Sequence, residues 1–212
     1  MEDAMPPTPP PAPRLRLDFF ETAVILSRWE GNGQTTSYPV AVQDVVSACT
    51  EISLSSGFLP PDTLFWRRQA NQTTLGIYVP GRRWQVRTDK KTYHVPMPPL
   101  VFVGQGHAYS LYAVKKRPLT AQTPLYHVPC PNVFAAGGIC PGATPFPACS
   151  AQSMSKALAL FWEGSLFNGH LSQGKCRSQP KDVRKLWAEL DGRRRFPLSE
   201  LVPAQMKLQA LL

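Results

Sequence analysis

The sequence predicts an α+β fold, in which an antiparallel β-meander of short strands is flanked by helices. Three observations support this class: a chain long enough for one core, six short strand-like runs separated by turn residues, and a later change to helical periodicity. The 212 residues are 43% hydrophobic, which suits one sizeable core. We therefore expect a single domain over residues 15–212.

The first residues are expected to lie outside this fold. Residues 1–14 are rich in proline and poor in the apolar side chains that build a core, which predicts a disordered segment. They also lack the basic and apolar regions of a secretory signal. No apolar stretch approaches the roughly 20 residues that span a bilayer. We expect a cytoplasmic protein with no membrane partner.

Two elements are predicted before the meander. Residues 18–29 and 35–42 are β-rich and flank the turn cluster at 30–34, which indicates a first hairpin. Residues 43–55 carry apolar side chains at helical spacing, which predicts a short helix with Cys49 in its buried face.

The meander is predicted from the turn residues that separate its strands. Turn residues such as Pro80-Gly81 separate the runs at regular intervals, and this spacing is typical of an antiparallel sheet. The prolines of residues 96–99 cannot donate to a ladder, so they indicate an edge or a crossing loop. The predicted strands are residues 63–69, 74–79, 84–88, 91–95, 100–103 and 108–115.

The helical period begins after residue 150. A first helix should start at a capping Ser153, and a second should have Pro180 in its first turn and end at Asp191-Gly192. The tail, residues 196–212, is expected to pack back on the domain. The apolar faces of the two helices are Met154, Ala157, Leu158, Phe161 and Trp162, and then Val183, Leu186, Trp187 and Leu190.

The chemistry is concentrated in residues 124–149, which hold three of the five cysteines. Cys140 follows a Gly-Gly-Ile turn and precedes Pro141-Gly142, so we expect an irregular loop that exposes its sulfur. Asn132 lies eight positions earlier, and an asparagine side chain can donate a hydrogen bond to an oxyanion. We therefore interpret Cys140 as a nucleophile and Asn132 as the residue that stabilises the developing anion.

These residues resemble the active-site stretch of ubiquitin-conjugating enzymes. That family has a His-Pro-Asn element with the catalytic cysteine eight positions beyond the asparagine, and here the matching segments are 130–133 and 138–140. The similarity covers about residues 18–203 and includes segments 78–84, 100–104 and 192–197. It is greatest to the divergent prokaryotic members, in particular to the type found in plasmid PRTRC cassettes.

The resemblance implies a two-step reaction without a cofactor. A ThiF-like activating enzyme would pass the C-terminus of a ubiquitin-like protein to Cys140 as a thioester, and an amine would then attack that thioester. Asn132 would stabilise the anion of the second step. The acceptor protein is not identified by the sequence.

The resemblance also assigns supporting roles. Cys130 stands where the family has its histidine, which orders the loop, and we assign this ordering role to Cys130, Pro131 and His127. A downstream acid that positions the incoming lysine in many members has no clear counterpart. Asp182 and Asp191 are better explained as residues of helix termini.

Two alternatives use the same thiols. Cys130, Cys140, Cys149 and His127 could hold a zinc ion, although the gaps between the cysteines are longer than the short arms of most structural sites. A Cys–His hydrolase that uses His127 is the other, and no acid or amide partner for it is evident.

Two further alternatives involve binding alone. A protein of this fold could be an adaptor that binds the ubiquitin-like protein without a thioester. The net charge of +9 and the pairs of basic residues near aromatic ones make nucleic-acid binding a weaker possibility. The residues concerned are Arg67-Arg68, Arg82-Arg83, Lys90-Lys91, residues 115–117 and residues 193–195, with Trp66, Trp84 and Tyr93.

Overall fold

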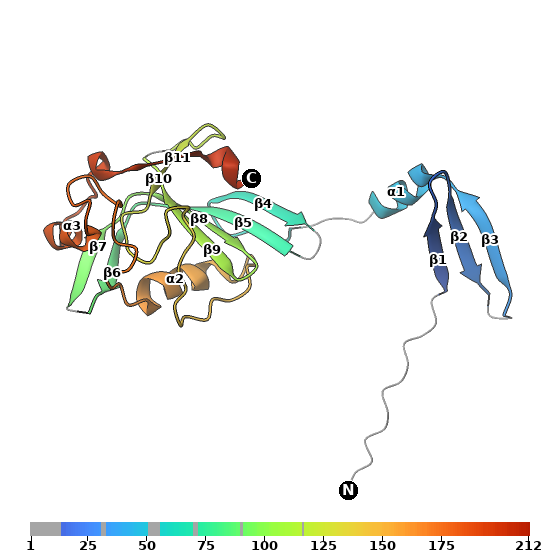
Figure 1. Cartoon of the computed structure of the whole chain (residues 1–212), viewed down its shortest axis with the longest axis horizontal. Coiled ribbons are helices and arrows are strands. Elements are labelled where there is room, and N and C mark those ends of the chain that lie inside the picture. Colours follow the sequence, from blue (N-terminus) through green and yellow to red (C-terminus); the bar gives the residue numbers. More distant parts are fainter. Residues whose placement is uncertain (1–13, 31–32, 51–55, 70–71, 90, 116) are drawn as a thin grey trace, which may run out of the picture. The chain divides into compact units, whose positions relative to one another are not determined.

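The computed structural model describes residues 14–30, 33–50, 56–69, 72–89, 91–115 and 117–212 (Figure 1). Of the N-terminal residues 1–14 predicted to be disordered, residues 1–13 lie outside the described residues. The chain divides into two compact units, residues 1–55 and 56–212, and each is described by itself. The predicted single domain over residues 15–212 stays a prediction.

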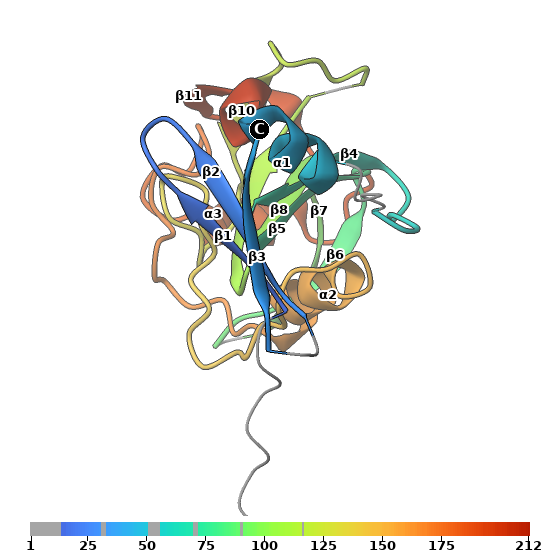
Figure 2. The same cartoon turned by 90° about the vertical axis from the view of Figure 1, so that its right-hand side faces the viewer.

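The first unit is a small antiparallel sheet followed by a helix (Figure 2). The predicted hairpin is confirmed, because β2 (Val24–Trp29) pairs with β3 (Thr35–Val40). The single run over residues 18–29 is wrong, since the chain reverses after Phe20, whose N–H donates to the Ala23 carbonyl (2.8 Å). This reversal creates an additional strand, β1 (Leu15–Phe19), which pairs with β2.

The helix of this unit, α1 (Val42–Thr50), is confirmed over its described part, and residues 51–55 of the prediction lie outside the described residues. Its predicted apolar face is not a core face. Cys49 is exposed, and Val46 is 51% exposed, so the expectation of a buried Cys49 is wrong. Helical spacing alone gave that expectation, and no described element of the unit covers these side chains.

The second unit is built on a six-stranded antiparallel sheet. All six strands of the predicted meander exist, and the α+β class is confirmed. The sheet also contains two strands that the sequence did not predict, one on either side of the helical region. In spatial order its strands are β11 (Pro203–Lys207), β10 (Pro124–His127), β9 (Ala108–Ala113), β8 (Leu100–Gln105), β5 (Gln72–Val79) and β4 (Thr63–Gln69).

Two of the predicted meander strands leave this sheet. β6 (Arg83–Arg87) and β7 (Thr92–Pro96) form a separate two-stranded ribbon, so β5 pairs directly with β8. The proline-rich segment after β7 is the crossing loop that returns the chain to the sheet. The ribbon is anchored by packing: the Trp84 ring stacks on the Trp162 ring, with 5.1 Å between the ring centroids.

The two predicted helices are α2 (Met154–Gly164) and α3 (Val183–Leu190), which lie against the ribbon (Figure 1). Every residue of their predicted apolar faces is buried. None of the described helices is long and apolar enough to cross a membrane.

The predicted helix ends are partly corrected. Ser153 occupies the N-cap position of α2 but makes no side-chain cap bond, because its hydroxyl donates to the Ala148 carbonyl (2.7 Å). α3 begins after Asp182, so Pro180 precedes the helix. The predicted stop is confirmed, with Gly192 at φ +77°.

The tail packs on the unit as predicted. It contains a short 3-10 turn (Leu198–Glu200), the edge strand β11 and a second 3-10 turn (Leu208–Leu211). Leu201 and Leu208 are buried, which anchors this last segment.

Candidate active site

The central stretch folds into a tight hairpin over residues 132–140. Val133 and Ile139 form an antiparallel bridge. The Cys140 N–H donates to the Asn132 carbonyl (2.8 Å), and the Phe134 N–H donates to the Gly138 carbonyl (2.8 Å). Because residues paired across an antiparallel ladder lie about 5.5 Å apart between Cα atoms, Asn132 and Cys140 are direct neighbours.

The hairpin is fixed to β9 of the central sheet. The Ile139 N–H donates to the Tyr109 carbonyl, and the Leu111 N–H donates to the Gly137 carbonyl. The donor–acceptor distance is 2.8 Å in both bonds. Gly137 has φ +87°, and a Cβ there would clash with the Tyr112 ring. Only glycine satisfies both the backbone angle and this close approach.

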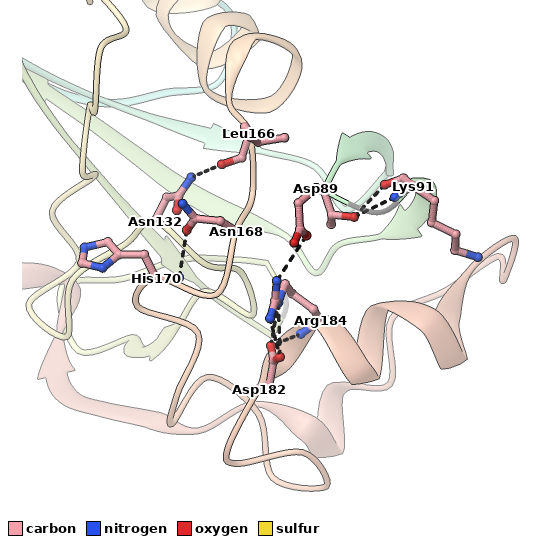
Figure 3. Close-up of polar contacts among 9 residues, drawn as sticks. Asp89, Lys91, Asn132, Leu166, Asn168, His170, Asp182 and Arg184 are labelled. Atoms are coloured by element: carbon pink, nitrogen blue, oxygen red, sulfur yellow. Dashed lines mark hydrogen bonds and ion pairs between the residues drawn. The ribbon is translucent and has the colours of Figure 1, made fainter.

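Asn132 is held by the segment that follows α2 (Figure 3). Its backbone has φ +59°, a left-handed conformation that asparagine tolerates better than most residues. Its Nδ2 donates to the Leu166 carbonyl (3.1 Å), and its backbone N–H donates to the His170 carbonyl (3.2 Å). The Asn168 side chain in turn accepts from the His170 N–H (2.8 Å). The amide of Asn132 is therefore oriented, and one of its two N–H groups is engaged.

A buried lysine that no sequence pattern indicated contacts the same hairpin. Lys175 is 4% exposed, and its Nζ donates to the carbonyls of Val133 (2.7 Å) and Phe134 (3.4 Å). Burial lowers the pKa of Lys175, and the nearby Cys130 opposes that shift. Lys175 thus ties the segment after α2 to the strand that carries Asn132.

The three residues assigned to loop ordering lie in the segment that leads into the hairpin. Cys130 is fully buried, and burial raises the pKa of its thiol far above the usual value. A thiol in that state is a poor nucleophile. Pro131 is buried beside it. Burial and the charge of Lys175 lower the pKa of His127, whose ring makes no hydrogen bond to any described residue.

The loop is also attached to α3. The Trp187 Nε1–H donates to the Pro129 carbonyl (2.8 Å) in a buried contact. Side-chain donors to the backbone of residues 129–140 therefore include Trp187 at Pro129, Lys175 at Val133 and Phe134, and Tyr112 at Ala136 (2.6 Å).

Cys140 is the accessible thiol of this unit. Cys130, Cys149 and Cys176 are buried, and burial raises the pKa of all three, whereas Cys140 is partly exposed. The remaining cysteine, Cys49, is exposed in the other unit.

The two aspartates near the helix ends have structural roles, as predicted. Asp182 is the N-cap of α3 and accepts from the Arg184 N–H, and its carboxylate also pairs with the Arg184 side chain (2.8 Å; Figure 3). Asp191 accepts from the His94 N–H (2.8 Å). Both carboxylates therefore accept from backbone N–H groups, that of Asp182 within α3 and that of Asp191 from β7.

The zinc alternative finds no support in the geometry. Within the part of the chain that the structure describes, no three His, Cys, Asp or Glu side chains are grouped to hold a metal ion. Cys130, Cys140, Cys149 and His127 are all described and are not gathered in this way.

Two of the aromatic rings that the nucleic-acid alternative needs for base stacking, Trp84 and Tyr93, are already in contact with other side chains. One face of Trp84 stacks on Trp162, and the Arg82 guanidinium lies 3.7 Å from the centroid of the Trp84 ring. The Lys91 Nζ lies 4.3 Å from the centroid of Tyr93. Lys90 and Lys116 lie outside the described residues.

Comparison with known proteins gives one family. The family model of prokaryotic E2 family D matches residues 40–204, well over half of the chain. The match spans the 132–140 hairpin, the segment after α2 and both helices of the second unit. Searches of curated proteins and of solved structures each found no significant match.

Proposed function

Because this chain belongs to prokaryotic E2 family D, a family of the ubiquitin-conjugating type, we propose that Cys140 carries a ubiquitin-like protein as a thioester. A ThiF-like activating enzyme delivers the modifier, and an amine receives it. The observation that carries the proposal is the pairing of Asn132 with a partly exposed Cys140 across the hairpin. We set the reaction in the cytoplasm, where thiols stay reduced, and the PRTRC type remains part of the proposal.

The first step is a transfer between two sulfur atoms. The Cys140 thiolate attacks the thioester carbonyl on the activating enzyme, a new C–S bond forms, and the old C–S bond breaks. The proton lost by Cys140 returns to the departing thiolate. The partial exposure of Cys140 supports this step, since the sulfur must meet a large partner.

The second step releases the modifier. A neutral amine attacks the Cys140 thioester, a C–N bond forms, the C–S bond breaks, and the amine's proton passes to solvent. The tetrahedral intermediate carries a negative oxygen. The second N–H of the Asn132 amide stabilises that oxygen, a contribution of about 3 kcal/mol where such donors have been removed from other enzymes.

The test is a charging assay on non-reducing gels. The full chain is mixed with a candidate ThiF-like enzyme, its ubiquitin-like partner and ATP. The wild type should form an adduct that thiols reverse. Cys140→Ser should form a thiol-resistant ester or nothing, and Cys140→Ala should form nothing.

The matched control is Cys49→Ser, which removes the other exposed thiol and should charge like the wild type. A thiol-sensitive adduct on Cys140→Ala would refute the assignment. If a partner set known to be active charges neither wild type nor control, the protein is instead an adaptor of the same fold.

A further inference from the structure

One edge of the β6–β7 ribbon is open. β7 lies along one side of β6, and the ladder bonds fall at even positions of β6. The Met97 N–H donates to the Arg82 carbonyl (2.9 Å), and the Thr88 N–H donates to the Lys91 carbonyl (3.0 Å). Because ladder bonds alternate along an antiparallel strand, the backbone groups of the odd positions point away from β7.

The chain itself uses one end of this edge. The Phe167 N–H donates to the Arg87 carbonyl (2.8 Å), and Leu166 forms a parallel bridge with Arg87. The outward N–H and C=O groups of Arg83 and Gln85 have no backbone partner among the described residues. Unpaired strand edges of this kind are templates for another extended chain.

A hollow of about 590 Å³ follows the edge. Its wall includes the exposed Arg83, Gln85 and Arg87 of β6 and the buried Trp84 on the opposite face of the ribbon. α2 contributes Trp162 and one acidic residue, Glu163. The indole nitrogens of the two tryptophans are buried and make no hydrogen bond to any described residue. The hollow therefore combines cationic side chains with the open backbone groups of Arg83 and Gln85.

A second hollow, of about 230 Å³, shares Arg82 with the first. It is lined by cations and apolar side chains, and no acidic residue is among its lining residues. Residues 56–212 hold 20 of the 23 basic residues and 7 of the 14 acidic ones. Within the described chain, none of the cations of the two hollows forms an ion pair with a carboxylate; they are Arg82, Arg83, Arg87, Lys115, Arg194 and Arg195.

We propose that the open edge of β6 is a docking site for an extended acidic segment of a protein partner, which adds as a strand beside Arg83 and Gln85. The excess of unpaired arginines selects acidic side chains. The apolar lining of the second hollow, which includes Met97 and Phe196, suits alternating apolar side chains.

A nucleic acid fits this surface less well. Single strands are held by bases that stack on free aromatic faces. The Trp84 ring is already in contact with Trp162, on which it stacks, and with the Arg82 guanidinium. The unpaired main-chain groups of β6 also match a peptide backbone rather than a phosphate chain.

The test is a binding titration of the full chain by fluorescence anisotropy. The probe is a labelled peptide that alternates Asp and Val, and a second probe of the same sequence carries N-methyl groups on alternate backbone amides. The first should bind and should weaken markedly between about 50 mM and 500 mM salt. The methylated probe, with equal charge, should bind at least about tenfold more weakly because it cannot form the ladder.

Two substitutions locate the binding. Arg83→Glu should weaken the peptide at least about tenfold, because it reverses a charge beside the open edge. Arg68→Glu is the matched control: it makes the same charge change on β4, lines neither hollow, and should alter affinity by less than about twofold. Unchanged thermal unfolding of both variants ensures that folding is intact.

Three outcomes would overturn the proposal. Equal binding of both peptides would show that charge attraction alone holds them and that no strand is added to β6. No binding of either would mean that the arginines only protect the edge. Tighter, Arg83-dependent binding of an oligo-dT strand would make this a nucleic-acid surface. None of these outcomes depends on thioester formation, so the proposed function stands or falls separately.

Discussion

At the residue scale, two different kinds of residue, Asn132 and Lys175, help to order the backbone of the 132–140 hairpin. Asn132 adopts φ +59° and lies opposite Cys140, and Lys175 reaches the hairpin from a segment more than 40 positions later, at Val133 (2.7 Å). The first contact is local and was readable from spacing. The second brings a buried cation to backbone carbonyls, and nothing in the local sequence indicates it.

Replacement of Asn132 by Gly separates backbone conformation from chemistry. Glycine adopts the left-handed angle without strain, so the hairpin should persist and charging of Cys140 should change by less than about twofold. Discharge to an amine should slow by about 100-fold, because the oxyanion loses its donor. Single-turnover rates of the two steps are the measurement.

Asn132→Asp is the companion variant, since it keeps the size of the side chain and removes the N–H donor. It should discharge as slowly as Asn132→Gly. Discharge at the wild-type rate in both variants would remove Asn132 from the mechanism.

Lys175→Met should loosen the hairpin locally. The substitution keeps an apolar stem and removes the donor to the carbonyls of Val133 and Phe134. Hydrogen exchange of the Phe134 and Cys140 amides, which bond across the hairpin, should quicken by about tenfold. Lys181→Met, on the surface, is the matched control and should leave both amides unchanged. Protection equal to wild type in Lys175→Met would show that the lysine does not order the loop.

At the element scale, the strands were predictable and their partners were not. Turn residues correctly marked the boundaries of the strands from β4 to β9, because glycine and proline affect the backbone at their own positions. The departure of the β6–β7 ribbon depends on packing of Trp84 against Trp162, two residues far apart in the chain. β10 and β11 were missed because each is short and begins with a proline, and three of the five residues of β11 are exposed.

The N-cap of α3 gives a prediction with a defined pH dependence. Hydrogen bonds from Arg184 lower the pKa of Asp182 below its ordinary value of 3.8. A carboxyl group with a lowered folded-state pKa stabilises the fold above that ordinary value, and the contribution is lost as the pH falls through the lowered one. Acid unfolding of the wild type should therefore include this loss.

Asp182→Asn keeps a good cap and removes the charge, so the free energy of unfolding should depend less on pH below about pH 4. Asp182→Ala loses the cap as well and should cost about 1 kcal/mol more at neutral pH. Urea titrations at several pH values measure both. Identical pH slopes in wild type and Asp182→Asn would contradict the assignment.

At the scale of the whole molecule, the core belongs to the second unit. Both clusters of buried apolar residues lie within residues 59–211, and the first unit leaves Val42 and Val46 exposed. The α+β class was predicted from the composition and from the change from strand-like runs to helical periodicity along the chain. The division into two units was not: residues 1–55 hold 3 of the 23 basic residues and 7 of the 14 acidic ones, but this difference in charge does not by itself locate a boundary at residue 55.

A fragment of residues 56–212 should therefore fold alone. Its core is complete, so it should unfold cooperatively with a midpoint within about 3 °C of the matching transition of the full chain. Calorimetry of both proteins measures this. A fragment of residues 72–212, which lacks β4, is the control and should be clearly less stable. A broad, non-cooperative transition for 56–212 would show that the first unit is needed.

The bond from Trp187 to Pro129 has a practical consequence. The indole proton of Trp187 is hydrogen-bonded two residues before Pro131, whereas those of Trp84 and Trp162 have no partner among the described residues. In an NMR spectrum the Trp187 signal should thus stand apart from these two. We therefore expect the Trp187 signal to report, from α3, on the order of the segment that leads into the 132–140 hairpin.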